Sequence, residues 1–220
     1  MKSQGQVTGG ALDHIVWVCD DLERGSRRIE TLTGATPRFG GVHASGRTHN
    51  ALLALGERCY LEILAPVEAE RADDDEWTRC ARAAADGRVL TYCLRSPRPL
   101  AELAVIAARH GWGNAQLQSN GRRRPDGVQL RWRWLAPQVA QFGPAFPFFI
   151  DWLDSPHPAE LPSAGDREPG ATLFQFSVGH PHAPELARAL AEFGCTIDTH
   201  EAPVAGFRVQ LGTPRGHIRL

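Results

Sequence analysis

Hydrophobic and polar positions alternate over short segments of this chain, and the alternation predicts many strands separated by a few helices. The strand-like segments share apolar residues at every second position: 12–18, 51–55, 59–64, 89–94, 128–135, 147–152, 172–178 and 207–211. Helical periodicity is found over residues 21–33 and 100–110, and Gly34 and Gly111 follow as stop signals. Short strands mixed with amphipathic helices indicate an α+β fold.

The order of these elements repeats three times. Residues 12–66, 88–152 and 171–220 each read as a βαβββ unit, and a proline-rich connection covers residues 153–170. Residues 1–11 are polar and are expected to form a flexible lead-in. A βαβββ unit leaves one sheet face uncovered, so we expect each unit to pair with another.

Two polar residues interrupt otherwise apolar strands. His14 lies within LDHIVWV at residues 12–18, and Glu62 lies within CYLEIL at residues 59–64. A carboxylate in a half-buried strand is costly unless it is paired, hydrogen-bonded or bound to a metal. We therefore expect the two strands to lie near each other, with both side chains in one pocket.

The segment between these strands supplies further candidates. A short strand is expected at residues 36–39, broken at Gly40-Gly41, and a loop then carries His43 and Asn50. Loop residues on a rigid scaffold often contact ligands, so both are predicted to bind substrate, although Asn50 could equally hydrogen-bond the loop backbone.

A basic run at residues 122–124 ends in the turn signal PDG. Guanidinium groups bind carboxylates and phosphates bidentately, and on this ground Arg124 is a candidate for substrate binding. The alternative is an exposed approach to a hairpin. Trp132 and Trp134 share one strand face and are either sheet-packing residues or a platform for a ligand.

Composition narrows the choice of partners and compartment. The net charge is −1 and the sequence pI is about 6.8, which argues against a nucleic-acid partner. Neither an apolar signal segment nor a run of about 20 apolar residues is present, so we expect a cytoplasmic protein without a membrane partner. Five cysteines without C-x-x-C spacing fit reduced thiols.

Several of these segments, in this order, carry a family resemblance. LDHIVWV at 12–18, GGVH at 40–43, HNAL at 49–52, YLEI at 60–63 and PFFIDW at 147–152 resemble the glyoxalase-like domain group of the vicinal oxygen chelate superfamily. That superfamily includes glyoxalase I, extradiol dioxygenases and bleomycin-resistance proteins. The resemblance implies paired βαβββ units whose curved mixed sheets form a cup, with the loop of His43 at its mouth. The third unit, at the C-terminus, is only βαβββ-like in pattern.

The resemblance also implies a ligand set. Superfamily metals are held by side chains near the start of the first strand and in the last strand of each unit, and His14 and Glu62 match the first-unit positions. The second unit departs from the pattern: residues 89–94 contain no His or carboxylate, and Ile150 stands opposite Glu62 with Asp151 on the other face. A divalent metal (Zn, Mn, Fe or Ni) on His14 and Glu62, a metal-free His–Glu pair and a structural role all stay open.

Two functions follow from these expectations. One is a small-molecule enzyme of isomerase, lyase or dioxygenase type, in which His14 and Glu62 are the catalytic and metal-binding residues and the substrate has neighbouring oxygens. The other is a non-catalytic small-molecule binding protein of the bleomycin-resistance kind, which the missing second-unit ligands favour. The third unit is also available to build a homodimer. The fold alone does not decide between enzyme and binder.

Overall fold

A single curved sheet of eight strands forms the centre of the computed structural model, which describes residues 12–67, 75–95, 98–124, 126–160 and 170–220. The first unit supplies five elements in chain order: β1 (Leu12–Val18), α1 (Leu22–Thr33), β2 (Arg38–Val42), β3 (Thr48–Gly56) and β4 (Cys59–Pro66). The second supplies β5 (Arg88–Leu94), α3 (Leu100–Arg109), β6 (Gln118–Arg123), β7 (Gln129–Leu135) and β8 (Phe148–Asp151). Helix α2 (Glu76–Arg82) lies between the two units in the chain.

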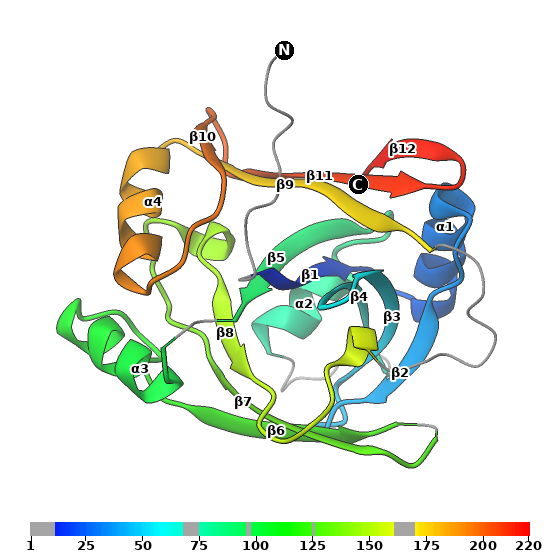
Figure 1. Ribbon diagram of the computed structural model, residues 1–220, viewed down its shortest axis with the longest axis horizontal. Helices are drawn as coiled ribbons and strands as arrows, with labels where there is room; N and C mark the ends of the chain where they lie inside the picture. The colour runs from blue at the N-terminus through cyan, green and yellow to red at the C-terminus, as the bar shows by residue number, and fades with distance from the viewer. Residues whose placement is uncertain (1–11, 68–74, 96–97, 125, 161–169) are drawn as a thin grey trace.

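The strand order is β2-β3-β4-β1-β5-β8-β7-β6, so the two units join along β1 and β5. In each unit the first strand runs parallel to the last, as β1 does to β4 and β5 to β8. The sheet bends until β2 and β6, its two edges, approach each other, and it encloses a nearly closed cup (Figure 1). The predicted α+β fold with paired βαβββ units around a cup is confirmed.

Local signals in the sequence explain the ends of helix α1. Asp21 caps its start by accepting from the Arg24 backbone N–H, and Gly34 ends it in the left-handed conformation with φ of 75°. Between these residues, Leu22, Gly25, Ile29 and Thr33 recur at helical spacing and are buried. The helix therefore covers the outside of the sheet with one apolar stripe.

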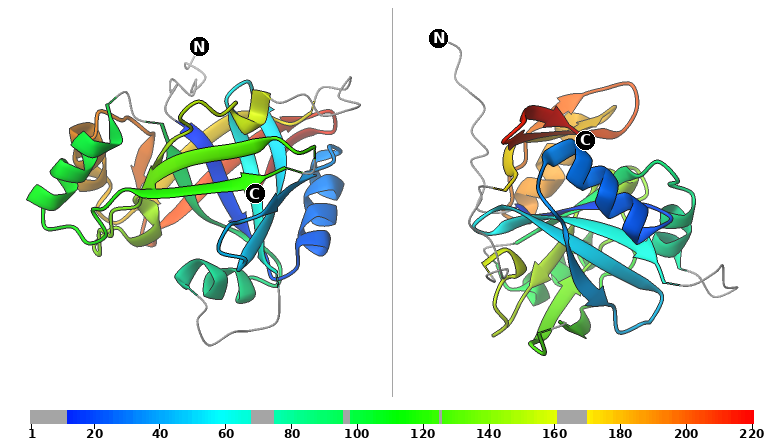
Figure 2. Two further views of the ribbon diagram at one scale, coloured as in Figure 1. Left: turned by 90° about the horizontal axis from the view of Figure 1, so that it is seen from below. Right: turned by 90° about the vertical axis from the view of Figure 1, so that its right-hand side faces the viewer.

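The third unit repeats the order of elements but pairs its strands differently. Its elements are β9 (Thr172–His180), α4 (Ala183–Glu192), β10 (Thr199–Glu201), β11 (Gly206–Thr213) and β12 (Gly216–Arg219). They form a separate sheet of order β10-β9-β11-β12, in which β9 runs parallel to the next strand rather than to the last. Figures 1 and 2 show this sheet lying against the outside of the cup.

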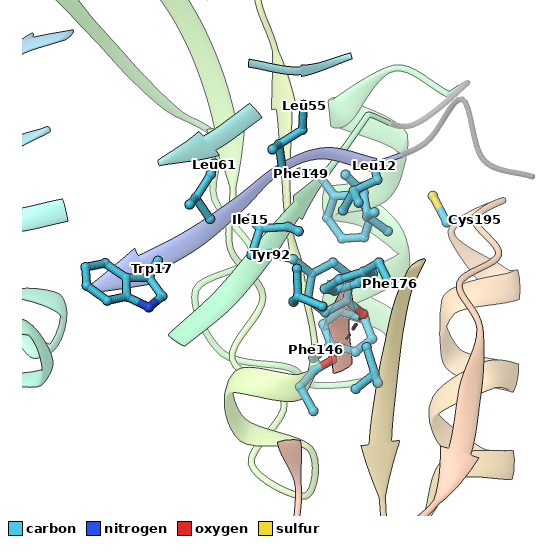
Figure 3. Close-up of a cluster of buried hydrophobic side chains, with 14 of the residues drawn as sticks. Leu12, Ile15, Trp17, Leu55, Leu61, Tyr92, Phe146, Phe149, Phe176 and Cys195 are labelled. Atoms are coloured by element: carbon cyan, nitrogen blue, oxygen red, sulfur yellow. Dashed lines mark hydrogen bonds between the residues drawn. The ribbon is translucent and has the colours of Figure 1, made fainter. Parts of the chain in front are cut away.

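The outer face of the large sheet and the inner face of the small sheet share one core. Tyr92 of β5 lies 5.0 Å from Phe176 of β9 between ring centroids, and its hydroxyl donates to the Ala145 carbonyl at 3.2 Å (Figure 3). Ile15 and Leu61 reach the same core from β1 and β4. All seven residues of β1 are buried, as expected for a strand covered on both faces.

Two segments differ from the sequence prediction. Gly40 and Gly41 do not break β2 but lie inside it, with a register shift between Phe39 and Gly41 against β3. Asn50, which was expected in the loop after Gly41, lies inside β3. The lead-in at residues 1–11 and the middle of the proline-rich connection, 161–169, fall outside the described residues. In the described part of the chain, no helix has the length and apolarity to cross a membrane.

Candidate functional site

A cavity of about 290 Å³ opens on the concave face of the eight-stranded sheet. The side chains that line it come from both units and include His14, His43, Asn50, Tyr60, Glu62, Trp77, Arg122, Trp132, Trp134, Phe148, Ile150 and Trp152. The structure thus brings together four of the five predicted site residues. The fifth, Arg124, lies by the β6–β7 turn, where its Nη2 is 2.8 Å from Asp126 Oδ2. Arg122, its neighbour at i−2, lines the cavity instead.

His14 is oriented by the residue before it. Its Nδ1 lies 2.7 Å from Asp13 Oδ1, and a register shift between β1 and β5 at residues 12–14 places these two neighbouring side chains together. Burial raises the pKa of Asp13, but hydrogen bonds from His14 and His157 lower it well below its ordinary value. The ionised carboxylate only accepts, so Nδ1 of His14 carries a proton that faces Asp13.

Asp13 gathers further donors at its second oxygen. Trp152 Nε1 donates to Oδ2 at 3.1 Å, and His157 Nε2 lies 3.2 Å from the same atom. His157 Nδ1 accepts from the Ala159 backbone N–H at 3.2 Å, so the proton of His157 is on Nε2 and faces Asp13. Asp13 is fully buried. Its hydrogen bonds therefore orient His14 and connect β1 to the segment after β8. Sequence reasoning missed it, although an Asp beside His14 in an apolar strand was a visible signal.

The Asn50 side-chain amide hydrogen-bonds Glu62, and Arg122 determines which way this amide faces. A guanidinium only donates, so the Asn50 atom that accepts from Arg122 Nη1 is Oδ1. The Asn50 Nδ2 group then donates to Glu62 Oε1 and lies 3.4 Å from His43 Nε2. With a donor facing it, His43 Nε2 carries the lone pair, and His43 Nδ1–H donates to Thr48 Oγ1 at 2.8 Å.

Charge states in the cavity follow from burial and neighbours. Burial raises the pKa of Glu62, but His14, His43, the Asn50 amide and Arg122 together bring it below its ordinary value, so this carboxylate is ionised. Burial lowers the pKa of His43, and the nearby Arg122 lowers it further against the opposing effect of Glu62. His43 is therefore neutral at pH 7.

The result is a carboxylate faced by two imidazole nitrogens. His14 Nε2 lies 3.7 Å from Glu62 Oε2, and His43 Nε2 lies 3.6 Å from Glu62 Oε1. Both distances exceed a hydrogen bond. Two imidazoles and a carboxylate are a common donor set for divalent first-row metals, so the donor types present fit a metal ion.

A second group of donor atoms lies beside this one. One atom each of Asp13, His14 and Cys93 lie within 4.8 Å of one another. Both Asp13 oxygens already accept from N–H groups, and burial holds the pKa of Cys93 well above its ordinary value, so the thiol keeps its proton. We interpret Asp13 as support for His14 and not as a ligand.

Strands β7 and β8 of the second unit form an apolar wall of the cavity. Trp132 and Trp134 of β7 and Phe148 and Ile150 of β8 line it, and Ile150 takes the position that the resemblance matches to Glu62. Asp151 lies on the other face, where it binds Arg133 at 2.9 Å. The tryptophan pair therefore packs in the sheet and also faces the cavity, and its role as a platform for a ligand stays a prediction.

The sequence model of the glyoxalase-like domain matches residues 12–194. The chain belongs to the glyoxalase-like domain family. This confirms the resemblance inferred from the strand motifs, and the match extends beyond the first two units into the third. No curated protein matches the chain at a significant level.

The chain is similar to several solved structures at low sequence identity. A hypothetical protein from Staphylococcus aureus is 16% identical with a TM-score of 0.62, over 94% of this chain and 84% of its own. A methylmalonyl-CoA epimerase variant from Streptomyces coelicolor, in complex with 2-nitronate-propionyl-CoA, is 18% identical with a TM-score of 0.46, over 64% and 95%. Methylmalonyl-CoA epimerase from Mycobacterium tuberculosis is 16% identical with a TM-score of 0.44, over 68% and 91%.

Proposed function

We propose that this glyoxalase-like protein is a metal-dependent small-molecule enzyme in which His14, His43 and Glu62 hold a divalent cation. The supporting observation is that the Nε2 atoms of His14 and His43 face one ionised carboxylate at distances beyond a hydrogen bond. Two imidazoles and a carboxylate are donor types that divalent cations prefer. A site with three protein ligands leaves positions open for substrate oxygens.

The proposed substrate is an organic molecule with neighbouring oxygens on an apolar body. A divalent cation held by these residues would supply Lewis acidity for negative charge that develops on a substrate oxygen. Asp13 holds the His14 tautomer, and Asn50 orients Glu62, so the donor atoms are set before substrate enters. Trp132, Phe148 and the other aromatic side chains exclude water around the substrate body. We expect an isomerase, lyase or dioxygenase-type reaction, with His14 and Glu62 next to the reacting oxygens.

One observation favours the alternative, a non-catalytic binding protein. The β7 and β8 side chains that face the cavity are aromatic or aliphatic, and Arg122 already places a positive charge near Glu62. In this alternative the aromatic wall binds an organic ligand, and the Glu62–Asn50–Arg122 network fixes the cavity without metal.

Metal analysis separates the two functions. The protein is purified without chelator or nickel affinity, and its metal content is measured alongside His14→Ala, His43→Ala and Glu62→Ala. His110→Ala is the matched control, because this exposed histidine pairs with Glu192 on the surface. We expect stoichiometric metal in the wild type and control, and affinity lower by about tenfold or more in the three variants.

Each other outcome has a defined meaning. Metal retained by His43→Ala but lost by the other two variants would remove His43 from the ligand set. Absence of metal in the wild type, also after soaking with zinc, manganese, iron and nickel, would rule out the metalloenzyme and leave the binding protein.

A further inference from the structure

Arg122 is a buried cation in the wall of the cup cavity. The residue is 5% exposed and lines the cavity from β6. In the register of β6 and β7, Asn120 stands opposite Trp132, and Arg122 follows Asn120 by two positions. Residues opposite each other in an antiparallel pair, and residues two apart in one strand, point to the same face of the sheet. Arg122 therefore lies on the concave face, together with Trp132.

One edge of the Arg122 guanidinium has no partner. Nη1 donates to Asn50 Oδ1, whereas Nε and Nη2 have no hydrogen-bond partner among the residues that the structure describes. In that part of the chain Ser177 Oγ is the unpartnered polar side-chain atom that is sealed from solvent, so the two Arg122 nitrogens are not sealed. Nε and Nη2 form one side of a planar fork that matches the two oxygens of a carboxylate.

Arg122 also lacks a direct counter-ion. In the described part of the chain no carboxylate lies within ion-pair distance of it. Two carboxylates line the same cavity: Glu62, which is separated from Arg122 by the Asn50 amide, and Asp75, which accepts from a backbone N–H as the N-cap of α2. Burial lowers the pKa of Arg122 against the opposing effects of Tyr60 and Glu62. The cost of burying this charge is therefore only partly compensated.

A purely structural role does not explain the charge. The hydrogen bond to Asn50 joins β6 to β3 where the two edges of the sheet approach, and it orients the Asn50 amide. One neutral N–H donor, such as that of a glutamine, is sufficient for this role and avoids the cost of a buried cation. The charge and the unpartnered edge of the fork therefore indicate a ligand, and not only a contact between strands.

We infer that Arg122 binds a carboxylate of the substrate, which makes the substrate an organic acid with an oxygen next to its carboxylate and an apolar body. This rests on the function proposed above, in which the same cavity is the substrate site. The neighbouring oxygen lies toward Glu62, since one amide side chain separates Glu62 from Arg122. A phosphate fits less well, because its charge of about −1.5 to −2 at pH 7 would lie beside the ionised Glu62. Arg47 lines the same cavity and adds to the attraction for an anion.

The test compares mandelate with 1-phenylethane-1,2-diol. Both probes have a phenyl body and neighbouring oxygens, and they differ in the charged carboxylate. We expect calorimetry to show that mandelate binds about tenfold or more tightly than the diol, and more tightly than phenyl phosphate. Equal binding of mandelate and the diol, no binding of mandelate at millimolar concentration, or tighter binding of phenyl phosphate would each overturn the inference.

Substitutions separate the charge of Arg122 from its hydrogen bond. Arg122→Gln keeps a donor for Asn50, so we expect it to bind mandelate about tenfold or more weakly and the diol within about twofold of the wild type. Arg124→Gln is the matched control, because Arg124 pairs with Asp126 and does not line the cavity. Equal weakening of both probes by Arg122→Gln would leave a structural role alone and overturn the inference.

A second variant is used if the glutamine variant does not fold, as judged by the dispersion of its amide spectrum. Arg122→Lys keeps the charge but loses the fork, so it should weaken the binding of mandelate and leave that of the diol unchanged. Mandelate should also shift the indole ¹H–¹⁵N signals of Trp132 and Trp134, identified by their loss in Trp132→Phe and Trp134→Phe. Shifts confined to other indoles would place the probe outside the cup and overturn the inference.

Removal of metal distinguishes this inference from the proposed function. Binding is measured on the protein as purified and again after treatment with a chelator. We expect the preference for mandelate over the diol to persist, since Arg122 contacts the substrate and not the metal. A preference that disappears with the metal would overturn the inference. A wild type that never holds metal ends the metalloenzyme proposal alone, whereas an Arg122→Gln variant that holds metal and binds mandelate as the wild type does ends this inference alone.

Discussion

Asp13 concentrates more polar contacts than any predicted site residue, and its charge has consequences for stability. The carboxylate is fully buried and accepts from His14, Trp152 and His157. In Asp13→Asn the amide nitrogen faces N–H donors and leaves at least one unpaired. We expect metal-free Asp13→Asn to lose about 2–4 kcal/mol of unfolding free energy at pH 7, measured by urea denaturation. Asp151→Asn, which alters an exposed ion pair, is the control and should lose less than about 1 kcal/mol.

The effect of Asp13 also depends on pH. Its folded-state pKa lies below its unfolded value of about 3.9, so its contribution is complete above that pH and disappears as pH falls toward the folded pKa. The difference between wild type and Asp13→Asn should therefore be largest near neutral pH and should narrow below about pH 4. A difference that stays constant down to pH 2.5 would show that packing, and not charge, accounts for the loss.

Some of the individual site residues are predictable from the sequence and others are not, and the difference has physical causes. His14 and Glu62 were predictable because a polar side chain in a buried strand needs a partner. Arg122 was harder to distinguish from Arg124, because residues at i and i+2 share a strand face and the end of β6, between them, decides which side chain enters the cavity. Asp13 was missed because simple alternation places it on the face opposite His14, whereas the bulge brings the two together.

Among the elements, β2 and β6 determine how far the cup closes. Gly40 lies in β2 where a Cβ would meet both Arg122 and Asn50, and a Cβ at Gly41 would lie 3.1 Å from the Arg123 carbonyl. Gly41 also has φ of 131°, a conformation that favours glycine. The pair was predicted to interrupt the strand. It instead allows the two sheet edges to approach, which is a tertiary requirement that local turn propensity does not contain.

Gly40→Ala tests whether the close approach of β2 to β6 requires a glycine at this position. The added methyl group must displace the Arg122–Asn50 contact, so we expect a loss of about 1–3 kcal/mol in unfolding free energy and weaker metal binding through Glu62. Gly206→Ala is the matched control, because a Cβ there has open space and the backbone angle is ordinary. If both variants unfold at the same urea concentration, the contact between β2 and β6 tolerates a side chain at residue 40, and a glycine is not required there.

For the whole molecule, the third unit explains why the large sheet is apolar on both faces. The inner face forms the cavity, while the outer face packs against β9 and β11 through Phe176, Val178 and Val209. The βαβββ order of this unit was predictable from its pattern, since strands and helices follow local periodicity. Its strand order was not, because pairing depends on contacts between distant segments, and whether it also forms a homodimer stays a prediction.

The shared outer core predicts that the two sheets unfold together. Phe176 is 4% exposed and contacts Tyr92 of the large sheet, whereas Phe174, in the same strand, is 45% exposed and contacts His217 of its own sheet. Phe176→Ala should therefore lower the unfolding free energy by about 3–5 kcal/mol, and Phe174→Ala by less than about 1 kcal/mol. Fluorescence and far-UV circular dichroism should report one coincident transition in both variants. Two separate transitions in Phe176→Ala would show that the third unit folds independently of the large sheet.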